Sequence, residues 1–223
     1  KMDEDFISRL SNTPVEDVTL LKIGVNATNL EWNRMIQDLK KNDPTQDESL
    51  EWLSAQVDLS SLIDLYMYHI FLSNSDYGNC AMWKTPTHKW SFIIYDADMA
   101  LRGDFDMNEL FYRNGGLRFR SLRVLMQWLL KNPRFKKMFM QRLSQVYFGD
   151  LSEEMWSKQM NQYVAKYTPH IQTSIELSGY PKLWDEEIVR LSKLYSKNYK
   201  SIPKEISSIL SLTSEEMNEY FKQ

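Results

Sequence analysis

The sequence predicts one domain of the mainly α, α+β class, and three observations lead to that prediction. Apolar residues recur at helical spacing along most of the 223 residues. Only two short segments, 80–84 and 90–95, have the apolar and aromatic character of β-strands. Glycine is scarce, with seven residues, and neither a G-x-G-x-x-G nor a G-x-x-x-x-G-K-[ST] motif occurs. We therefore expect a helical bundle with one short β-hairpin and no glycine-rich phosphate loop.

Two short helices are expected near the N-terminus. In the first, apolar side chains lie three or four residues apart or side by side on one face: Trp32, Met35, Ile36 and Leu39. The stretch 42–44 contains a proline and stops this helix, and a second helix follows at about 46–54. Residues 1–58 carry twelve acids and six bases. We therefore describe residues 1–57 as an acidic, helical N-terminal segment.

A longer helix begins after Asp58, because a carboxylate is a favoured N-cap group. Its side chains are apolar or aromatic almost all round, which predicts a central and buried position: Leu62, Ile63, Leu65, Tyr66, Tyr68, His69, Ile70, Phe71 and Leu72. The histidine on this helix is interpreted as a core residue and not as a ligand. The polar stretch 73–79 ends the helix, and the two strands follow as a hairpin joined by residues 85–89.

Beyond the hairpin, residues 96–118 show no clear pattern, and an irregular segment of that length usually serves a function. Helical spacing then returns in five segments: 120–131, 133–148, 152–177, 183–199 and 203–211. Thr213 and Glu216 form a capping box for a last short helix. Within the single domain we group residues 58–118 as the central helix, hairpin and loop, and residues 119–223 as a helical subdomain.

Basic residues are concentrated in residues 111–149, which carry nine bases and no acid: Arg113, Arg118, Arg120, Arg123, Lys131, Arg134, Lys136, Lys137 and Arg142. This basic block, 113–142, is either a solvated helix face or a surface that binds an acidic or phosphorylated partner. The formal charge is −3 and no nucleic-acid module is recognisable, so we expect no nucleic-acid binding. No apolar run is long enough for a transmembrane segment.

Acidic side chains follow the second predicted strand at Asp96 and Asp98. If the chain stays extended there, both carboxylates point to the same side of the strand end. The hairpin also brings Asp76 and Asn79 close to Asp96, because the start of the first strand pairs with the end of the second. Oxygen ligands of this kind suit Mg²⁺ or Mn²⁺ together with substrate phosphates. These four residues are therefore the candidate site.

The local alternative is that each carboxylate only closes an Asx turn, and an Asp-x-Asp pair by itself is common. Two features favour a functional role: the acids follow the most apolar segments of the chain, and they converge through a short hairpin. Other chemistry has less support. The three histidines lie far apart, which argues against a histidine-built zinc site, and the single cysteine, Cys80, excludes an intrachain disulfide.

At these residues the sequence resembles the CotH spore-coat family of atypical protein kinases. The specific part of the resemblance is the run from the predicted central helix to the end of the hairpin: 58–71, 74–79, 82–84 and 89–98. Weaker similarity continues downstream, so that the resemblance covers about residues 45–200: 125–130, 132–135 and 184–187. The resemblance implies a protein-kinase-like C-lobe, an exported or cell-surface location, and a protein substrate or a coat or surface partner.

The resemblance also implies an activity, the transfer of the γ-phosphoryl group of ATP to a protein Ser or Thr. Such a site needs a carboxylate for the acceptor hydroxyl, and a carboxylate and an Asn for the metal ions that hold the phosphates. Asp76 matches the catalytic-loop Asp, Asn79 the metal-assisting Asn, and Asp96 the metal-binding Asp with Asp98 in support. The implied cofactors are Mg²⁺ or Mn²⁺, with ATP as the phosphoryl donor.

The sequence departs from ordinary kinases in two places. Two residues, instead of four, separate Asp76 from Asn79, and Asp-Ala-Asp stands in place of Asp-Phe-Gly. Residues 2–6 are similar to the segment that follows the small nucleotide-covering lobe, so we expect that lobe to be largely missing here, with Lys22 a weak candidate for a phosphate-facing lysine. Because the chain begins with Lys1, it is interpreted as processed or truncated, and the activity is assigned to its full-length parent.

Two other functions stay open. The first is a non-catalytic coat or surface assembly protein that keeps the fold and binds its partners through the basic block. The second is a sugar transferase that uses Asp-x-Asp to hold a nucleotide-sugar diphosphate through a metal ion. A sugar transferase normally has alternating strands and helices, and the helix-rich sequence with one hairpin argues against it.

Overall fold

The computed structural model describes residues 2–22, 29–103, 105–112, 119–178 and 183–222. Within these ranges the helices are α1 (Glu4–Ser11), α2 (Leu30–Asp38), α3 (Asp47–Ser54), α4 (Leu59–Leu72), α5 (Met107–Tyr112), α6 (Arg120–Leu129), α7 (Pro133–Phe148), α8 (Glu153–Ser178), α9 (Leu183–Leu210) and α10 (Ser214–Phe221). Short 3-10 turns occur at Val15–Asp17 and Leu39–Lys41. The strands are β1 (Thr19–Lys22), β2 (Cys80–Thr85) and β3 (His88–Ile94). The predicted mainly helical class is confirmed.

The three strands form an antiparallel sheet in the order β1-β2-β3. The predicted hairpin is confirmed as β2 and β3, although its turn is shorter than the expected residues 85–89 because the strands extend to Thr85 and from His88. The strand β1 was not predicted. All four of its side chains are half-buried, so it lacks the alternation of buried and exposed residues by which a strand is recognised.

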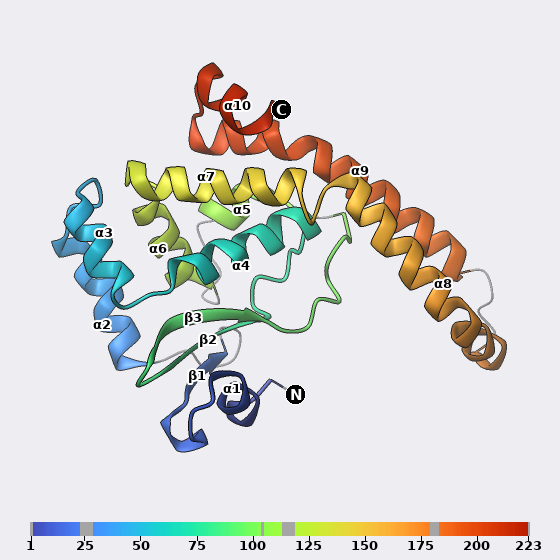
Figure 1. Ribbon diagram of the computed structural model, residues 1–223, viewed down its shortest axis with the longest axis horizontal. Helices are drawn as coiled ribbons and strands as arrows, with labels where there is room; N and C mark the ends of the chain where they lie inside the picture. The colour runs from blue at the N-terminus through green and yellow to red at the C-terminus, as the bar shows by residue number, and fades with distance from the viewer. Residues whose placement is uncertain (1, 23–28, 104, 113–118, 179–182, 223) are drawn as a thin grey trace.

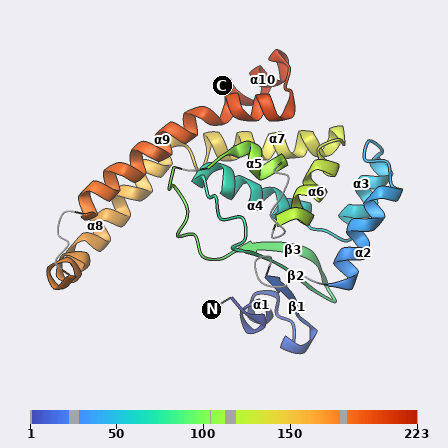
Figure 2. The same ribbon diagram turned by 180° about the vertical axis from the view of Figure 1, so that it is seen from behind.

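Helix α4 lies at the centre of the molecule, between the sheet on one side and α7 on the other (Figures 1 and 2). The carboxylate of Asp58 caps it, because Oδ1 accepts hydrogen bonds from the backbone N–H groups of Ser60 and Ser61 at 3.0 and 3.2 Å. His69 is fully buried on this helix, as expected of a core residue, and its Nδ1 lies 3.1 Å from the Asn74 carbonyl oxygen. The prediction of a capped, central helix is confirmed.

The C-terminal helices differ from the prediction at one point. Two helices were expected at 183–199 and 203–211, whereas α9 is continuous from Leu183 to Leu210 with Pro203 inside it. Proline removes one helical hydrogen bond, but its neighbours Ile202 and Ile206 are buried in the core and hold this part of the helix in place. Figures 1 and 2 show α8 and α9 side by side, extending away from the rest of the molecule.

Two shorter elements bear on the remaining predictions. The capping box before α10 is confirmed, because Glu216 N–H donates to Thr213 Oγ1 and Thr213 N–H donates to Glu216 Oε2, at 3.2 and 2.8 Å. The segment 96–118, expected to be irregular, contains α5. Its residues 104 and 113–118 lie outside the described part of the chain.

The basic block is held in part by acids from distant segments. Lys136 Nζ lies 3.0 Å from Glu216 Oε1, and Arg142 Nε lies 2.7 Å from Asp64 Oδ1. The first part of the block, 113–118, lies outside the described residues. These ion pairs favour the interpretation of the block as a helix face, while its role as a partner surface stays a prediction. No helix among the described residues is long and apolar enough to span a bilayer.

Candidate functional site

The loop that carries Asp76 is shaped by two consecutive side-chain turns. Helix α4 ends at Leu72, and its C-cap residue Ser73 has a left-handed backbone with φ of 46°. The Asn74 Oδ1 then accepts a hydrogen bond from the Asp76 N–H at 3.0 Å, and Asp76 Oδ1 accepts one from the Gly78 N–H at 3.0 Å. The local-turn alternative is therefore realised at Asp76, but the turn engages only one of the two carboxylate oxygens. The turn also fixes the direction of the carboxylate.

Asn79 and Asp96 are joined directly. The Tyr95 N–H donates to the Asn79 carbonyl oxygen at 3.2 Å, and Asn79 Nδ2 donates to the Asp96 carbonyl oxygen at 3.4 Å. The ladder pair Cys80 and Ile94 lies next to this junction. The expected proximity of Asn79 to Asp96 is confirmed. Because the amide nitrogen of Asn79 is engaged with the backbone, its Oδ1 is the atom left to act as a ligand.

The backbone turns sharply at Asp96 instead of staying extended. Strand β3 ends at Ile94, and Asp96 has a left-handed conformation with φ of 57°. The expectation of an extended segment at Asp96 was therefore wrong, and the common direction of the Asp96 and Asp98 carboxylates stays a prediction. Asp tolerates this conformation better than most residues with a side chain, and residues held in it often occur at functional sites. Both carboxylates are exposed, and Asp98 belongs to the turn that leads toward α9.

Tyr95 lies next to Asp96, which follows it in the chain, and close to the Lys22 ammonium group at the end of β1. Burial raises the pKa of the Tyr95 hydroxyl, and the Asp76 and Asp96 carboxylates raise it further. The ammonium group of Lys22, at the end of β1, lies 5.9 Å from the centre of the Tyr95 ring. A cation from the edge strand therefore lies beside the residue that directly precedes Asp96.

Two buried polar groups, one on α4 and one at the start of the Asp76 loop (residues 73–79), have hydrogen-bonding capacity that is not used. Asn74 is fully buried, and neither its Nδ2 nor the Tyr68 hydroxyl has a hydrogen bond of ordinary geometry among the described residues. Burial raises the pKa of Tyr68, the Asn74 amide lowers it, and the Asp96 carboxylate raises it. Buried polar groups in this condition mark a place for an ordered water, an ion or a ligand oxygen.

Arg123 packs against the Asp76 loop, although from the sequence it was placed only in the basic block and not in the site. Its side chain comes from α6, is only 5% exposed, and donates from Nε to the Glu109 carbonyl oxygen at 2.9 Å. The guanidinium lies 5.2 Å from the centre of the Tyr77 ring and 5.4 Å from that of Phe119. Because Tyr77 directly follows Asp76, this cation–π contact fixes the base of the loop.

The donor atoms of the site are compatible with a hard divalent cation. Among the described residues, no three His, Cys, Asp or Glu side chains gather into a metal-binding group. Mg²⁺ does not require one, because it commonly takes one or two carboxylates and fills its remaining positions with water and phosphate oxygens. Asp96, the Oδ1 of Asn79 and the second oxygen of Asp76 fit that chemistry. The roles of these residues and of Asp98 stay predictions.

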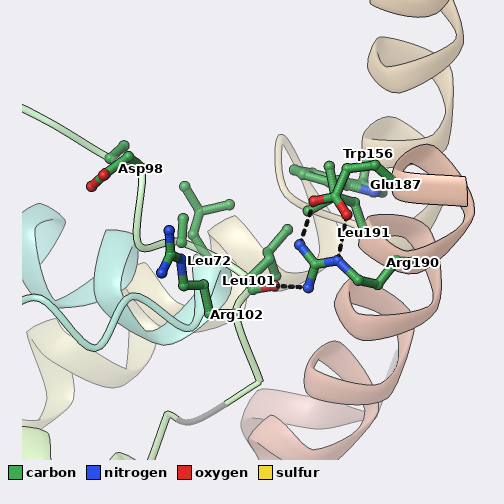
Figure 3. Close-up of a pocket in the computed structure, with 10 residues that line it drawn as sticks. Leu72, Asp98, Leu101, Arg102, Trp156, Glu187, Arg190 and Leu191 are labelled. Carbon is green, nitrogen blue, oxygen red and sulfur yellow. Dashed lines mark hydrogen bonds and ion pairs between the residues drawn. The ribbon is translucent and has the colours of Figure 1, made fainter. Parts of the chain in front are cut away.

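A cavity of about 690 Å³ opens between the turn that contains Asp98 and the helices α8 and α9 (Figure 3). On the α9 side, Glu187 and Arg190 form an ion pair, and Arg190 Nη1 donates to the Leu101 carbonyl oxygen at 2.8 Å. Asp98 and Arg102 line the opposite side. Sequence reasoning missed Arg190, because its contact with Leu101 joins segments far apart in the chain and has no local motif.

The family model described as CotH kinase protein matches residues 3–202 of the chain. Neither a curated protein nor a solved structure matches it at the level of similarity that we required. The family match spans most of the chain and includes all four residues of the candidate site. It supports a kinase-like fold, in agreement with the central helix, the hairpin and the loop that follows. The chain therefore belongs to the CotH kinase protein family.

Proposed function

We propose that the full-length parent of this chain is a metal-dependent kinase that transfers the γ-phosphoryl group of ATP to a Ser or Thr hydroxyl of a protein. The observation that carries the proposal is the junction of Asn79 with Asp96 at the end of the hairpin, with Asp76 held in a turn three residues before Asn79. Phosphoryl transfer depends mainly on positioning and electrostatic stabilisation. A site built from a few rigidly held oxygen ligands meets that requirement.

In the proposed mechanism each residue has one role. Asp76 accepts the proton of the acceptor hydroxyl, and its hydrogen bond from the Gly78 N–H keeps the carboxylate aimed at that hydroxyl. Asp96 and Asn79 hold Mg²⁺ or Mn²⁺, with Asp98 in support. An ion held by these residues would supply positive charge that offsets the negative charge of the phosphates. Lys22, which lies over the Tyr95 ring, supplies a further positive charge for the phosphates.

The direct test is phosphoryl transfer from radiolabelled ATP by the full-length parent. Asp96→Asn keeps the size of the side chain but removes the charge that the metal needs, so we expect incorporation to fall by about a hundredfold or more. Asp150→Asn is the matched control, because Asp150 is exposed and lies outside the site. Equal incorporation by the wild-type protein and the Asp96→Asn variant would remove the assignment.

The competing function is a non-catalytic coat or surface assembly protein with the same fold, which would share the exported or cell-surface location that we propose. Thermal stabilisation by ATP with Mg²⁺ separates the two. A working site stabilises the folded state by RT ln(1 + [L]/Kd), about 2.7 kcal/mol at a hundred times Kd. A scaffold that does not bind nucleotide shows no shift in melting temperature, and the Asp96→Asn variant provides the reference for a lost site.

A further inference from the structure

Besides Asp96, three residues with positive φ lie in the Asp76 loop (residues 73–79) and the Asp96 loop (residues 96–103), and all three lie close to α9. They are Ser73 with φ of 46°, Leu101 with φ of 54° and Gly103 with φ of 94°. For Ser73 and Leu101 this conformation is unfavourable, because a side chain crowds the following carbonyl group. Such residues persist only where the surrounding structure holds them. The contacts with α9 are therefore candidates for what holds the two loops.

The contacts come from one face of α9. Arg190 Nη1 donates to the Leu101 carbonyl oxygen at 2.8 Å, and Asn198 Nδ2 donates to Ser73 Oγ. Between them, Leu194 Cδ2 lies 3.7 Å from the position that a Cβ atom on Gly103 would take. The contributing side chains are four residues apart, so they lie one above the other on the helix surface: Arg190, Leu194 and Asn198. Both loops therefore lie against the same face of α9.

Arg190 is held in place for this contact. Its Nε and Nη2 donate to the two carboxylate oxygens of Glu187 at 2.6 and 2.5 Å, which directs Nη1 at Leu101 (Figure 3). The Leu101 N–H in turn donates to the carbonyl oxygen of Leu72, the last residue of α4, at 2.9 Å. Since Leu72 adjoins Ser73, the Asp76 loop and the Asp96 loop are joined at the end of α4 and are both fastened to α9.

We propose that Arg190 and Asn198 are positioning residues that fix the Asp76 loop and the Asp96 loop relative to each other. Arg190 acts through Leu101 on the segment that begins at Asp96, and Asn198 acts through Ser73 on the segment that leads to Asp76. The effect of these two residues on catalysis rests on the proposed function. Their role in holding the two loops against α9 does not. The exposed pair of helices α8 and α9 is then a structural part of the site.

Hydrogen exchange tests the fastening without reference to activity. In Arg190→Met we expect the amides of residues 97–103, the Leu101 amide in particular, to exchange about tenfold faster or more, because a charge-assisted hydrogen bond is lost. The amides of β2, β3 and α7 should not change. Lys193→Met is the matched control, since it removes an exposed cation from the same helix. Equal protection of 97–103 in wild-type protein and Arg190→Met overturns the proposal.

Kinetics of the full-length parent test the catalytic consequence. We expect Arg190→Met to raise the Mg²⁺ concentration needed for half-maximal activity about tenfold and to lower kcat, and Arg190→Lys to restore part of both. A variant that loses only stability would leave the metal dependence unchanged, and that result overturns the catalytic role. If Arg190→Met does not fold, Asn198→Leu decides the question through exchange of residues 73–79. If the wild-type full-length parent transfers no phosphoryl group, the proposed function is ruled out. The hydrogen-exchange result still tests whether α9 holds the two loops in place.

Discussion

The central helix α4 and the outer helix α9 both hold the candidate site, but by different means. Helix α4 is buried almost all round, and the Asp76 loop that follows it is shaped by turns between residues two apart. Helix α9 is only partly buried along its outer half and reaches the same loops by single polar contacts, such as those of Arg190 and Asn198, across 89 and 125 residues of sequence. The core side depends on packing, and the outer side on a few directed hydrogen bonds.

The largest contrast is expected in stability. Phe71 on α4 is fully buried, whereas Tyr163 on α8 is 58% exposed. Phe71→Ala should lower the free energy of unfolding by about 3 to 5 kcal/mol, because it leaves a cavity in the core. Tyr163→Ala should change it by about 0.5 kcal/mol or less. Urea unfolding measures both, and similar losses in the two variants would show that α8 and α9 are as tightly packed as the core.

The buried His69 makes stability depend on pH. Burial lowers the pKa of His69 from 6.5 to about 4, an effect that outweighs its hydrogen bond with Asn74 and the nearby Asp76 carboxylate. The unfolded chain therefore binds more protons than the folded one between these pH values, and stability falls as pH drops through that window. Between pH 7 and pH 5 the loss from this group is about 2 kcal/mol.

The control for that prediction lies on α8. We expect His69→Gln to flatten the change in free energy of unfolding between pH 7 and pH 5, because the titrating group is gone. His170→Gln removes an exposed histidine and should leave the change as it is in the wild-type protein. If the two variants respond alike, the pH dependence comes from other groups.

The N-cap of α4 is expected to contribute less to the free energy of unfolding than a buried core side chain does. Asp58→Ala removes the acceptor of the Ser60 and Ser61 N–H groups and should lower the free energy of unfolding by about 1 kcal/mol. Asp58→Asn, which can still cap, should lower it by less. Thermal or urea unfolding resolves this difference, and a loss in Asp58→Asn as large as in Asp58→Ala would point to charge instead of capping.

The smallest effect is expected for the ion pair between Arg142 on α7 and Asp64 on α4. Its nitrogen and oxygen lie 2.7 Å apart, but the two side chains are 43% and 52% exposed. A double-mutant cycle with Arg142→Met and Asp64→Asn should give a coupling free energy of about 0.2 to 1 kcal/mol, which falls as salt is added. A larger coupling that salt does not weaken would contradict this reading of the basic block.

Much of the α4 side of the site could be predicted because its signals are local. The Asp58 cap, the all-round apolar helix, the turn residues and the two strands each leave a pattern within a few residues. The proximity of Asn79 to Asp96 followed from the hairpin pairing alone. Local patterns therefore fixed which residues meet at the strand end.

The remaining features depend on contacts that leave no local pattern. Strand β1 is recognised only by its pairing with β2, and α9 crosses Pro203 because buried neighbours hold it. The left-handed turn at Asp96 removes the extended geometry on which the common direction of Asp96 and Asp98 depended. The contact of Arg190 with Leu101 is a tertiary hydrogen bond, and no spacing rule within the sequence indicates it.

The central claim is that the Asp76 loop and the Asp96 loop share one divalent ion. Paramagnetic broadening of backbone amide signals by Mn²⁺ tests it most directly, because the effect is confined to amides near the ion. We expect Mn²⁺ to broaden the amides of residues 76–79 and 95–98 together at the same concentrations, and Asp96→Asn to abolish both effects. Broadening of only one loop, or broadening that persists in Asp96→Asn, would contradict the claim.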